Sequence, residues 1–370
     1  MKILEVVNVD FSLVHFLLPL MRALRARGHE VVGVCADGRL LDGPRAEGFR
    51  IETPPLARSL DPVAQLRAYA ALRDLIRRER PNLVHGHGPI AGLLARIAAR
   101  RAGVPRIATT CHGFLFNQPG PWWRRTLALG LERATGRLAQ TYITVSEAEA
   151  ADARRLGIHP GAVAVLNGRD PARFRPDAAT RALLRAEFGA GDGDCVILFV
   201  GRLVADKGIR ELLAAMAATP DNAVLWIAGE RLASDRGEDL EPHFARAAQR
   251  LGRRLVRLGY RADVARVMAA ADVFCLPSYT EAMPMTAIEA MHVGLPVVGS
   301  AVGGLLEQVV EGETGLLVPR MRPEPLAAAL SRLAADAALR SRMGEAGRRR
   351  AAERFDEATN IARTVALLEG

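Results

Sequence analysis

Short apolar runs alternate with amphipathic segments along this chain of 370 residues. The apolar runs are continuous rather than alternating, which is typical of parallel strands buried on both faces. Regular alternation of such strands with helices predicts an α/β fold whose parallel sheets are covered on both sides. The predicted strands are 3–9, 29–35, 82–88, 106–113, 195–201, 223–229, 255–260, 271–278 and 295–301, and the predicted helices are 17–28, 62–79, 89–102, 207–218, 240–252 and 263–270.

The pattern stops near the middle of the chain and then restarts. The segment between the halves, NGRDPARFRPDAAT (167–180), is rich in Pro, Asp and Arg, which is typical of a linker. We therefore predict two Rossmann-like domains with a central cleft, in which ligands bind beyond the carboxyl ends of the strands. The predicted parts are an N-terminal acceptor-side domain over 1–170, a linker over 171–190, a C-terminal donor-binding domain over 191–352, and a final helix over 353–370 that returns toward the N-terminal domain.

Composition narrows the class of protein. The longest apolar runs are far too short to span a bilayer, and no basic-then-apolar leader opens the sequence, so we expect a cytoplasmic protein. The cysteines are widely spaced, lie in or beside predicted strands and form no CxxC pair, so we expect buried free thiols in a reducing compartment. They are Cys35, Cys111, Cys195 and Cys275.

The positive charge is concentrated in the first half of the chain. Residues 1–175 carry a balance of +11 and residues 176–370 a balance of −2, within a total of +9. No nucleic-acid module and no interleaved aromatic platform accompany this basic half, so we expect no nucleic-acid partner. An anionic membrane surface, a phosphorylated acceptor or simple solubility remains open as the reason for the charge.

The stretch SYTEAMPMTAIEAM (278–291) places two acids in an apolar context. Glu281 follows a predicted strand, and Pro284 suits the first position of a helix that carries Glu289 and ends at Gly294. Carboxylates beside a cleft are natural acceptors for sugar hydroxyls, because charged acceptors make the stronger hydrogen bonds. The alternative for Glu289 is a solvent-facing helix position, against which its apolar neighbours argue.

Two further segments place charged residues or paired glycines at predicted strand ends. In FVGRLVADKG (199–208), Arg202 and Lys207 flank a turn that leads into a helix, which is a suitable diphosphate site. Lys207 is also one of only two lysines in the chain. In SAVGGLLEQVVEGETGLLVP (300–319), Gly303 and Gly304 let backbone amides approach a ligand closely.

The histidines give a weaker signal. His112 follows a predicted strand, and His85 and His87 form an HGH pair at the end of another. Because no third ligand at a sensible spacing accompanies that pair, we expect no metal site. The GxSxG elbow of hydrolases is absent as well.

Taken together, these motifs resemble the family 4 glycosyltransferases, which have the GT-B fold. The resemblance covers essentially the whole chain, and its most specific element is the pair of glutamates spaced by seven residues together with Arg202 and Lys207. The motifs that carry it are GRLVADKG, SYTEAMPMTAIEAMHVGLPVV and GGLLEQVVEGETGLLV in the second half, and SLVHFLLPLMRALRARGHEV, RPNLVHGHGPIAGLLARIAARRAGVP, TTCHGFLF and VSEAE…LNGRDPARF in the first.

The resemblance implies a retaining, metal-independent transfer of a sugar from a nucleotide-sugar, usually a UDP-sugar, in surface-polysaccharide synthesis. It implies that Glu281 and His112 contact the transferred sugar, that Glu289 holds the ribose, and that Arg202 and Lys207 neutralise the leaving diphosphate. No cofactor is expected beyond the substrate. The remaining residues that we expect around the nucleotide-sugar are Gly201, Ala282, Met283, Pro284, Met285, Gly303 and Gly304.

The acceptor is less well defined. The first strand is followed by NVDFSLVHF, without the glycine-rich turn of many relatives, and Ile90 stands where relatives often have lysine. The segment PWWRRTLALGLERATGRL (121–138) sets Trp122 and Trp123 beside arginines on a predicted amphipathic helix. This suggests attachment to the inner face of the membrane and a saccharide or polyprenyl-diphosphate-linked acceptor. The alternative is that both tryptophans pack against the domain core.

Other functions compete with the transfer. A nucleotide-sugar epimerase or a glycosyl phosphorylase could use a similar two-domain frame, and a non-catalytic nucleotide-sugar-binding subunit could keep the fold alone. An NAD-dependent oxidoreductase is disfavoured, because no GxGxxG follows the first strand.

Overall fold

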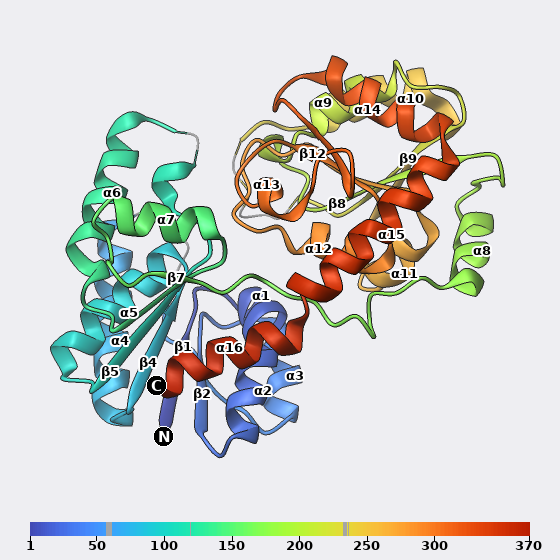
Figure 1. The fold of residues 1–370 in the computed structure, drawn as a ribbon. Helices are drawn as coiled ribbons and strands as arrows, with labels where there is room; N and C mark the ends of the chain where they lie inside the picture. The colour runs from blue at the N-terminus through green and yellow to red at the C-terminus, as the bar shows by residue number, and fades with distance from the viewer. Residues whose placement is uncertain (57–60, 119, 232–234, 236) are drawn as a thin grey trace. The chain divides into compact units, whose positions relative to one another are not determined.

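The computed structural model describes residues 1–56, 61–118, 120–231, 235 and 237–370. The chain forms two compact α/β units (Figure 1). The first comprises Met1–Leu166 and Ala358–Gly370, and the second comprises Asn167–Glu357. The last residues of the chain therefore belong to the first unit.

The first unit is built on a parallel sheet of seven strands. The strands are β1 (Lys2–Val6), β2 (Glu30–Val34), β3 (Arg50–Glu52), β4 (Leu83–His87), β5 (Arg106–Cys111), β6 (Thr141–Thr144) and β7 (Val163–Ala164). Their order in the sheet is β3-β2-β1-β4-β5-β6-β7, and every neighbouring pair is parallel. The direction of winding reverses between β1 and β4, which makes the ends of these two strands the switch point of the sheet.

Helices cover both faces of this sheet. They are α1 (Asp10–Ser12), the π-helix η1 (Leu13–Leu17), α2 (Leu18–Ala26), η2 (Arg39–Leu41), α3 (Asp42–Ala46), α4 (Pro62–Glu79), α5 (Pro89–Ala102), η3 (Leu115–Asn117), α6 (Trp122–Gly136), α7 (Glu147–Arg155) and α16 (Glu357–Glu369). On one face Leu72 of α4 and Ala95 of α5 join a buried cluster with Val84. On the other, Met21 of α2 and Leu368 of α16 join a second cluster. This packing on both faces explains why β1 and β2 consist mostly of buried apolar residues.

Local sequence determines where the main helices begin and end. Asp61 caps α4, because its carboxylate accepts from the amides of Val63 at 3.1 Å and Ala64 at 3.3 Å, and Pro62 opens the helix. Pro89 likewise opens α5, and Gly103 ends it with a φ of 71°. Both helices match their predicted bounds, 62–79 and 89–102.

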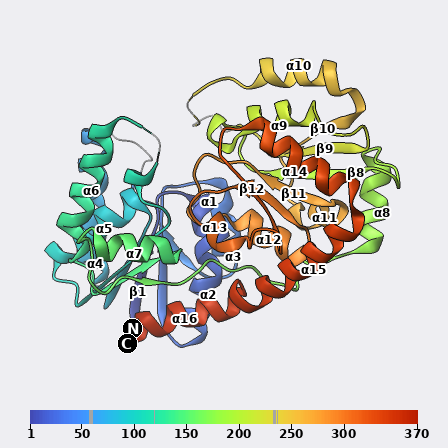
Figure 2. The same cartoon turned by 45° about the horizontal axis from the view of Figure 1, so that its top comes forward.

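The second unit has a parallel sheet of six strands. They are β8 (Cys195–Val200), β9 (Ala223–Ala228), β10 (Leu255–Gly259), β11 (Val273–Leu276), β12 (Val297–Ser300) and β13 (Gly315–Val318), arranged as β10-β9-β8-β11-β12-β13. The helical segments are α8 (Ala178–Glu187), η4 (Ala205–Lys207), α9 (Ile209–Met216), α10 (Glu241–Leu251), η5 (Gly252–Arg254), α11 (Val264–Ala270), α12 (Met285–Val293), α13 (Leu305–Gln308), α14 (Pro323–Ala335) and α15 (Ala337–Arg354). Figure 2 shows α9, α10 and α14 on one face and α8, α11, α12 and α15 on the other.

Most of the segment predicted as a linker is folded into the second unit. Asp177 caps α8 through the Thr180 amide at 2.9 Å. From α8, Arg181 and Arg185 both bind the Asp272 carboxylate, at 2.6 and 2.9 Å. Polar residues of the predicted linker (171–190) therefore form a helix cap and ion pairs, which sequence alone does not distinguish from solvated chain.

Two expectations from composition can be compared with the fold. All four cysteines are buried and free, as predicted. Among the described helices, none has both the length and the apolarity that crossing a bilayer requires.

Candidate active site

The two charged segments of the second half follow neighbouring strands. β8 and β11 lie side by side where the strand order reverses, so the loops after them share the switch point of the sheet. Lys207 belongs to the loop after β8, and Glu281 belongs to the loop after β11. Ligands of doubly wound sheets bind in the crevice outside such strand ends. The parallel topology therefore brings together residues that are 74 positions apart in the chain.

Lys207 and Glu281 form the charged pair at this edge. The Lys207 ammonium donates to Oε1 of Glu281 at 2.6 Å, and the Ser278 hydroxyl donates to the same oxygen at 2.6 Å. The Glu281 side chain is 10% exposed and that of Lys207 is 23% exposed. Gly208 makes this approach possible, because a Cβ there would lie 2.1 Å from the carbonyl oxygen of Pro277. The result is a desolvated carboxylate and a cation that a small anionic ligand can reach.

Three hydrogen-bond donors hold the loop that carries Glu281. The Gly304 amide donates to the Glu281 carbonyl at 3.2 Å, Asn167 to the Met283 carbonyl at 2.8 Å, and Gln308 to the Pro284 carbonyl at 3.0 Å. Asn167 and Gln308 were not identified from the sequence, since an isolated amide side chain has no spacing signal.

The backbone of this loop turns its carbonyls inward to these donors. In the described part of the chain, the amides of Ala282 and Met283 donate no recorded hydrogen bond. Both amides can therefore serve a ligand. Pro284 has no N–H, and its carbonyl accepts from Gln308. Unlike Ala282 and Met283, it can therefore contact a ligand only by packing.

Gly303 and Gly304 are needed for close contact with the same loop. A Cβ on Gly303 would lie 1.8 Å from the Glu281 carbonyl oxygen, and one on Gly304 would lie 2.0 Å from that of Ala282. Gly303 also has a φ of 44°, which glycine adopts at little cost. The two glycines therefore fix the position of the Glu281 loop. The Gly304 amide, which we expected to face a ligand, instead donates to the Glu281 carbonyl of that loop.

Arg202 has a different partner from Lys207. Its guanidinium forms an ion pair with Asp235, and its side chain is 48% exposed. Gly201, just before it, lies against the neighbouring strand end, since a Cβ on Gly229 would meet the Gly201 carbonyl oxygen at 1.9 Å. The structure thus places Arg202 just after β8, where it pairs with Asp235 and not with Glu281.

Glu289 is buried on α12, with a relative exposure of 7%. Nε of Arg169 donates to its Oε1 at 2.7 Å. The solvent-facing alternative for Glu289 is therefore wrong. Arg169 lies in the segment predicted as a linker, and its backbone also pairs with that of Asp356 and Glu357. No local pattern predicts this contact, through which both ends of the second unit are joined to helix α12.

In the first unit, a buried polar cluster lies at the switch point between β1 and β4. Nε2 of His87 is 2.7 Å from Oε2 of Glu5, and Nδ1 of His85 is 3.0 Å from the same oxygen. Nδ1 of His87 is 3.2 Å from Nε2 of His112, which follows β5. All of these side chains except His112 are at most 2% exposed. Glu5 is not recognisable from the sequence, because it lies 80 residues from His85 and inside an apolar run.

Glu5 also changes the assessment of the HGH pair. The ligand atoms of Glu5, His85 and His87 lie within 4.8 Å of one another, so the third group that the sequence lacked is supplied by the neighbouring strand. In the structure these atoms are hydrogen-bonded to each other. The other ring nitrogen of each histidine is also paired, that of His85 with the Thr110 hydroxyl at 2.8 Å.

Burial, neighbouring charges and hydrogen bonds together determine the charges within this cluster. Burial raises the pKa of the Glu5 carboxyl, but the charge of His85 and hydrogen bonds from His85 and His87 outweigh it and lower that pKa to about 2. Burial and the charge of His85 lower the pKa of His87 to about 4. Burial and the charges of His87 and His85 lower the pKa of His112 to about 3. Near neutral pH the cluster therefore holds a carboxylate beside neutral His87 and His112.

Comparison with known proteins identifies the family of this chain. A model of the family described as "Glycosyl transferases group 1" matches residues 180–350, and a "Glycosyl transferase 4-like domain" model matches residues 14–168. The alpha-maltose-1-phosphate synthase of Mycolicibacterium smegmatis is 30% identical over 343 residues, which cover 86% of each chain. The chain belongs to the family 4 glycosyltransferases.

A second relative and a solved structure extend the comparison for this glycosyltransferase. The UDP-Gal:alpha-D-GlcNAc-diphosphoundecaprenol alpha-1,3-galactosyltransferase of Escherichia coli is 30% identical over 261 residues, which span 68% of this chain and 66% of that protein. Among solved structures, HepE of Anabaena in complex with UDP-glucose has a TM-score of 0.83 at 23% identity, with 99% of each chain covered. This likeness shows that the glycosyltransferase has the GT-B fold.

Helix α6 of this glycosyltransferase presents apolar side chains to solvent. Trp122 is 77% exposed, Trp123 50%, Leu127 57% and Leu131 41%. Trp123, Leu127 and Leu131 recur at every fourth position and so share one side of the helix. The alternative in which both tryptophans pack against the domain core is therefore wrong.

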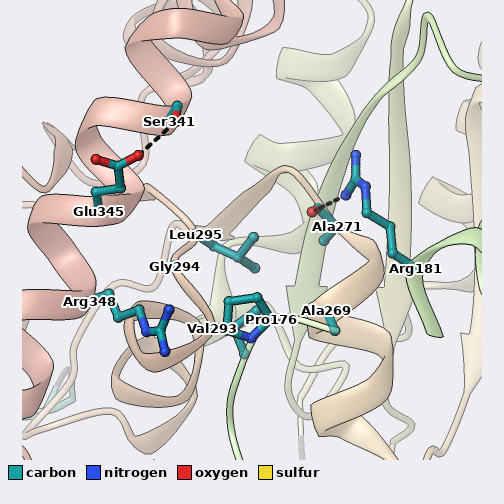
Figure 3. Close-up of a pocket in the computed structure, with 10 residues that line it drawn as sticks. All are labelled: Pro176, Arg181, Ala269, Ala271, Val293, Gly294, Leu295, Ser341, Glu345 and Arg348. Atoms are coloured by element: carbon teal, nitrogen blue, oxygen red, sulfur yellow. Dashed lines mark hydrogen bonds between the residues drawn. The ribbon is translucent and has the colours of Figure 1, made fainter. Parts of the chain in front are cut away.

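A pocket in the second unit lies away from these strand ends. Its volume is about 280 Å³, and Figure 3 shows its lining. Leu295 precedes β12 and Ala271 precedes β11, so the pocket lies at the amino ends of the strands. Ligands of such sheets bind at the opposite edge, and we assign no part of the transfer reaction to this pocket.

Proposed function

We propose that this glycosyltransferase moves a sugar from a nucleotide-sugar to a saccharide or polyprenyl-diphosphate-linked acceptor, with retention of configuration and without a metal. The observation that carries the proposal is the pair of Lys207 and Glu281 at the switch point of the second sheet. These two side chains are joined by one hydrogen bond. The cation suits the diphosphate of a bound sugar diphosphate, and the desolvated carboxylate suits the hydroxyls of its sugar.

The diphosphate is the leaving group, and negative charge develops on it as the sugar departs. Lys207 and Arg202 are the cations that we assign to it, with the amides of Ala282 and Met283 as further hydrogen-bond donors. Groups that are fixed in place before the reaction lower the barrier because they need no reorganisation at the transition state. In this proposal they take the place of a divalent cation.

The carboxylates bind the neutral parts of the substrate. Glu281 accepts hydrogen bonds from hydroxyls of the transferred sugar, and Glu289 accepts them from the ribose. His112 of the first unit contacts the sugar as well, as the resemblance to the family implies. Retention requires that the acceptor hydroxyl attack on the face from which the diphosphate leaves.

The relatives support the choice of substrates. HepE binds UDP-glucose, and the E. coli relative uses a UDP-sugar with a diphosphoundecaprenol-linked acceptor. We therefore propose a UDP-sugar as the substrate and a lipid-linked glycan of surface-polysaccharide synthesis as the acceptor. An acceptor of this kind carries a diphosphate, which suits the balance of +11 over residues 1–175.

The exposed face of α6 supports attachment to the inner face of the membrane. Two tryptophans and two leucines are exposed there beside Arg124 and Arg125. Aromatic and basic side chains together favour the interface of an anionic bilayer. Replacing Trp122 and Trp123 with alanine should abolish sedimentation with phosphatidylglycerol vesicles. Leu66→Ala is the matched control, because Leu66 is 67% exposed on α4 of the same unit. Binding that depends on neither the tryptophans nor the anionic lipid would refute membrane attachment.

The transfer itself is tested in two steps. A thermal-shift screen of UDP-, GDP- and ADP-sugars identifies the nucleotide, since ligand at about a hundredfold excess over its Kd adds about 2.7 kcal/mol of stability. The selected nucleotide-sugar is then incubated with a polyprenyl-diphosphate sugar in EDTA, and the anomeric configuration of the product is read by NMR. We expect a product of retained configuration.

The same assay separates the competing functions. An epimerase would change the nucleotide-sugar without an acceptor, and a phosphorylase would require inorganic phosphate. A non-catalytic subunit would bind the nucleotide-sugar without forming any product. Inverted configuration, or activity lost in EDTA and restored by a divalent cation, would refute the proposed mechanism.

A further inference from the structure

The transfer reaction as proposed uses only His112 of the buried cluster in the first unit. Glu5, His87 and His112 form an unbroken chain of hydrogen bonds from the centre of the sheet to a half-buried residue. Its two links are 2.7 Å, from Glu5 Oε2 to His87 Nε2, and 3.2 Å, from His87 Nδ1 to His112 Nε2. The three side chains come from β1, β4 and the residue after β5, so rigid strands hold this hydrogen-bond chain in place.

The chemistry of each group fixes the direction of these bonds. An ionised carboxylate can only accept, so Nε2 of His87 must carry the proton that it shares with Glu5. A neutral imidazole has one N–H, which leaves Nδ1 of His87 as an acceptor. Nε2 of His112 must then donate to it, and Nδ1 of His112 is left with an unshared pair of electrons.

We propose that Glu5 and His87 are positioning residues that hold His112 in its Nε2–H tautomer, so that Nδ1 of His112 accepts a hydrogen bond from a substrate hydroxyl. Among the described residues, no partner is recorded for Nδ1 of His112. His112 thus acts as a fixed acceptor and does not donate a proton to the substrate. The link to the substrate rests on the proposed function, whereas the tautomer does not.

The alternative charge state is disfavoured by the surroundings. A protonated His87 would donate to His112 and reverse the last bond. The ring of His87 lies 4.0 Å from that of His85 and 5.5 Å from that of His112, so a positive charge on it would face two other imidazoles inside the sheet. Burial, which lowers the pKa of His87 to about 4, acts in the same direction.

His85 offers a matched comparison within the same cluster. It also bonds Glu5, but its other nitrogen meets the Thr110 hydroxyl at 2.8 Å instead of His112. Removing that hydroxyl with Thr110→Val leaves the chain from Glu5 to His112 intact. Replacing the carboxylate with Glu5→Gln introduces an amide that can donate as well as accept, so His87 is no longer forced to keep its proton on Nε2.

The test is a long-range ¹H–¹⁵N correlation spectrum of the full-length protein labelled with ¹⁵N-histidine. The spectrum distinguishes protonated from unprotonated ring nitrogens at each of the eight histidines. In the wild-type protein we expect His112 and His87 each as a single Nε2–H tautomer. In Glu5→Gln we expect a mixture of tautomers at His112, and in Thr110→Val an unchanged His112 signal.

Kinetics provide a second measurement. We expect Glu5→Gln to lower kcat by about 10- to 100-fold, the range found when groups that orient metal-ligating histidines are replaced. The KM for the nucleotide-sugar should change little, because the second unit binds the nucleotide. A purely structural role would instead lower the melting temperature without changing the tautomer.

Several results would overturn the inference. They are a protonated Nδ1 or mixed tautomers at His112 in the wild-type protein, and an identical His112 spectrum in Glu5→Gln. One equivalent of copurified metal would also do so, because ligation would replace the hydrogen bonds. The wild-type spectrum decides by itself if Glu5→Gln does not fold. A protein that shows the expected tautomer but transfers no sugar would refute the proposed function and leave the hydrogen-bond chain standing.

Discussion

The ammonium of Lys207 and the carboxylate of Glu281 lie 2.6 Å apart and neutralise each other. The same holds for the other charged residues of the candidate site, since Arg202 pairs with Asp235 and Glu289 with Arg169. In the proposed function, a nucleotide-sugar exchanges these partners for its own phosphate and hydroxyl groups. The pairs keep the side chains in place at the strand ends, and they compete with the substrate for the same charges.

This competition predicts an unusual effect of Glu281→Gln. The change removes the anion that Lys207 now binds, so UDP should bind more tightly, by about 1 kcal/mol or about fivefold. Turnover should fall sharply, because the proposed function assigns this carboxylate to the transferred sugar. Calorimetric titration with UDP and steady-state assays measure the two effects. Weaker binding of UDP to the variant would show that Lys207 depends on Glu281 for its position.

Replacing Lys207 should have the opposite effect on binding. A charge-assisted hydrogen bond contributes about 1.5 to 3 kcal/mol, so Lys207→Ala should weaken UDP binding by about 10- to 150-fold. The control is Arg253→Ala, which removes a cation paired with Asp194 just before β8, away from the site. Equal losses in the two variants would mean that only the overall charge of the unit matters.

The close approach at Gly304 can be tested without changing any charge. Gly304 has an ordinary helical backbone with a φ of −64°, but an added Cβ would lie 2.0 Å from the Ala282 carbonyl oxygen. Gly304→Ala should therefore displace the Glu281 loop and reduce kcat/KM by at least tenfold with little backbone strain. Gly193→Ala is the matched control, since a Cβ there meets nothing within 4 Å. A Gly304→Ala variant with normal activity would mean that the loop position is not critical.

The acid stability of the first unit should depend on Glu79. Hydrogen bonding to Lys2, opposed by burial and reinforced by Arg50 and Arg78, lowers the pKa of Glu79 to about 2. A carboxyl whose pKa falls on folding stabilises the protein above its unfolded pKa, near 4.5, and loses that effect as the pH falls toward 2. Glu79→Gln should therefore destabilise the first unit at pH 7, on the order of 2 kcal/mol after screening.

The difference between Glu79→Gln and the wild-type protein should narrow between pH 5 and pH 3. Hydrogen exchange of the β1 amides is a suitable measurement, because Lys2 opens that strand and a chain of two units need not unfold in one step. The variant and the wild-type protein are compared at each pH. A difference that stays constant down to pH 3 would mean that Glu79 acts through packing and not through its charge.

Local sequence alone determined much of this protein. Continuous apolar runs identified the main strands, because a strand buried on both faces has no polar positions to alternate. Asp61 and Pro62 fixed the start of α4, since caps act within one turn. Arg202, Lys207, Glu281 and Glu289 were recognisable because they follow predicted strands or lie on the helix after one, in an order that resembles a known family.

Only the tertiary structure decided which of these residues meet. The pairing of Lys207 with Glu281 depends on β8 and β11 being neighbours, and that of Arg169 with Glu289 depends on the path of the chain back across the second unit. In the sequence Glu5 is one polar residue in an apolar strand, and the fold brings His85 and His87 of β4 beside it. Hydrogen bonds and ion pairs act over a few ångströms, and the distances between residues far apart in sequence are set by strand order, which no local pattern contains.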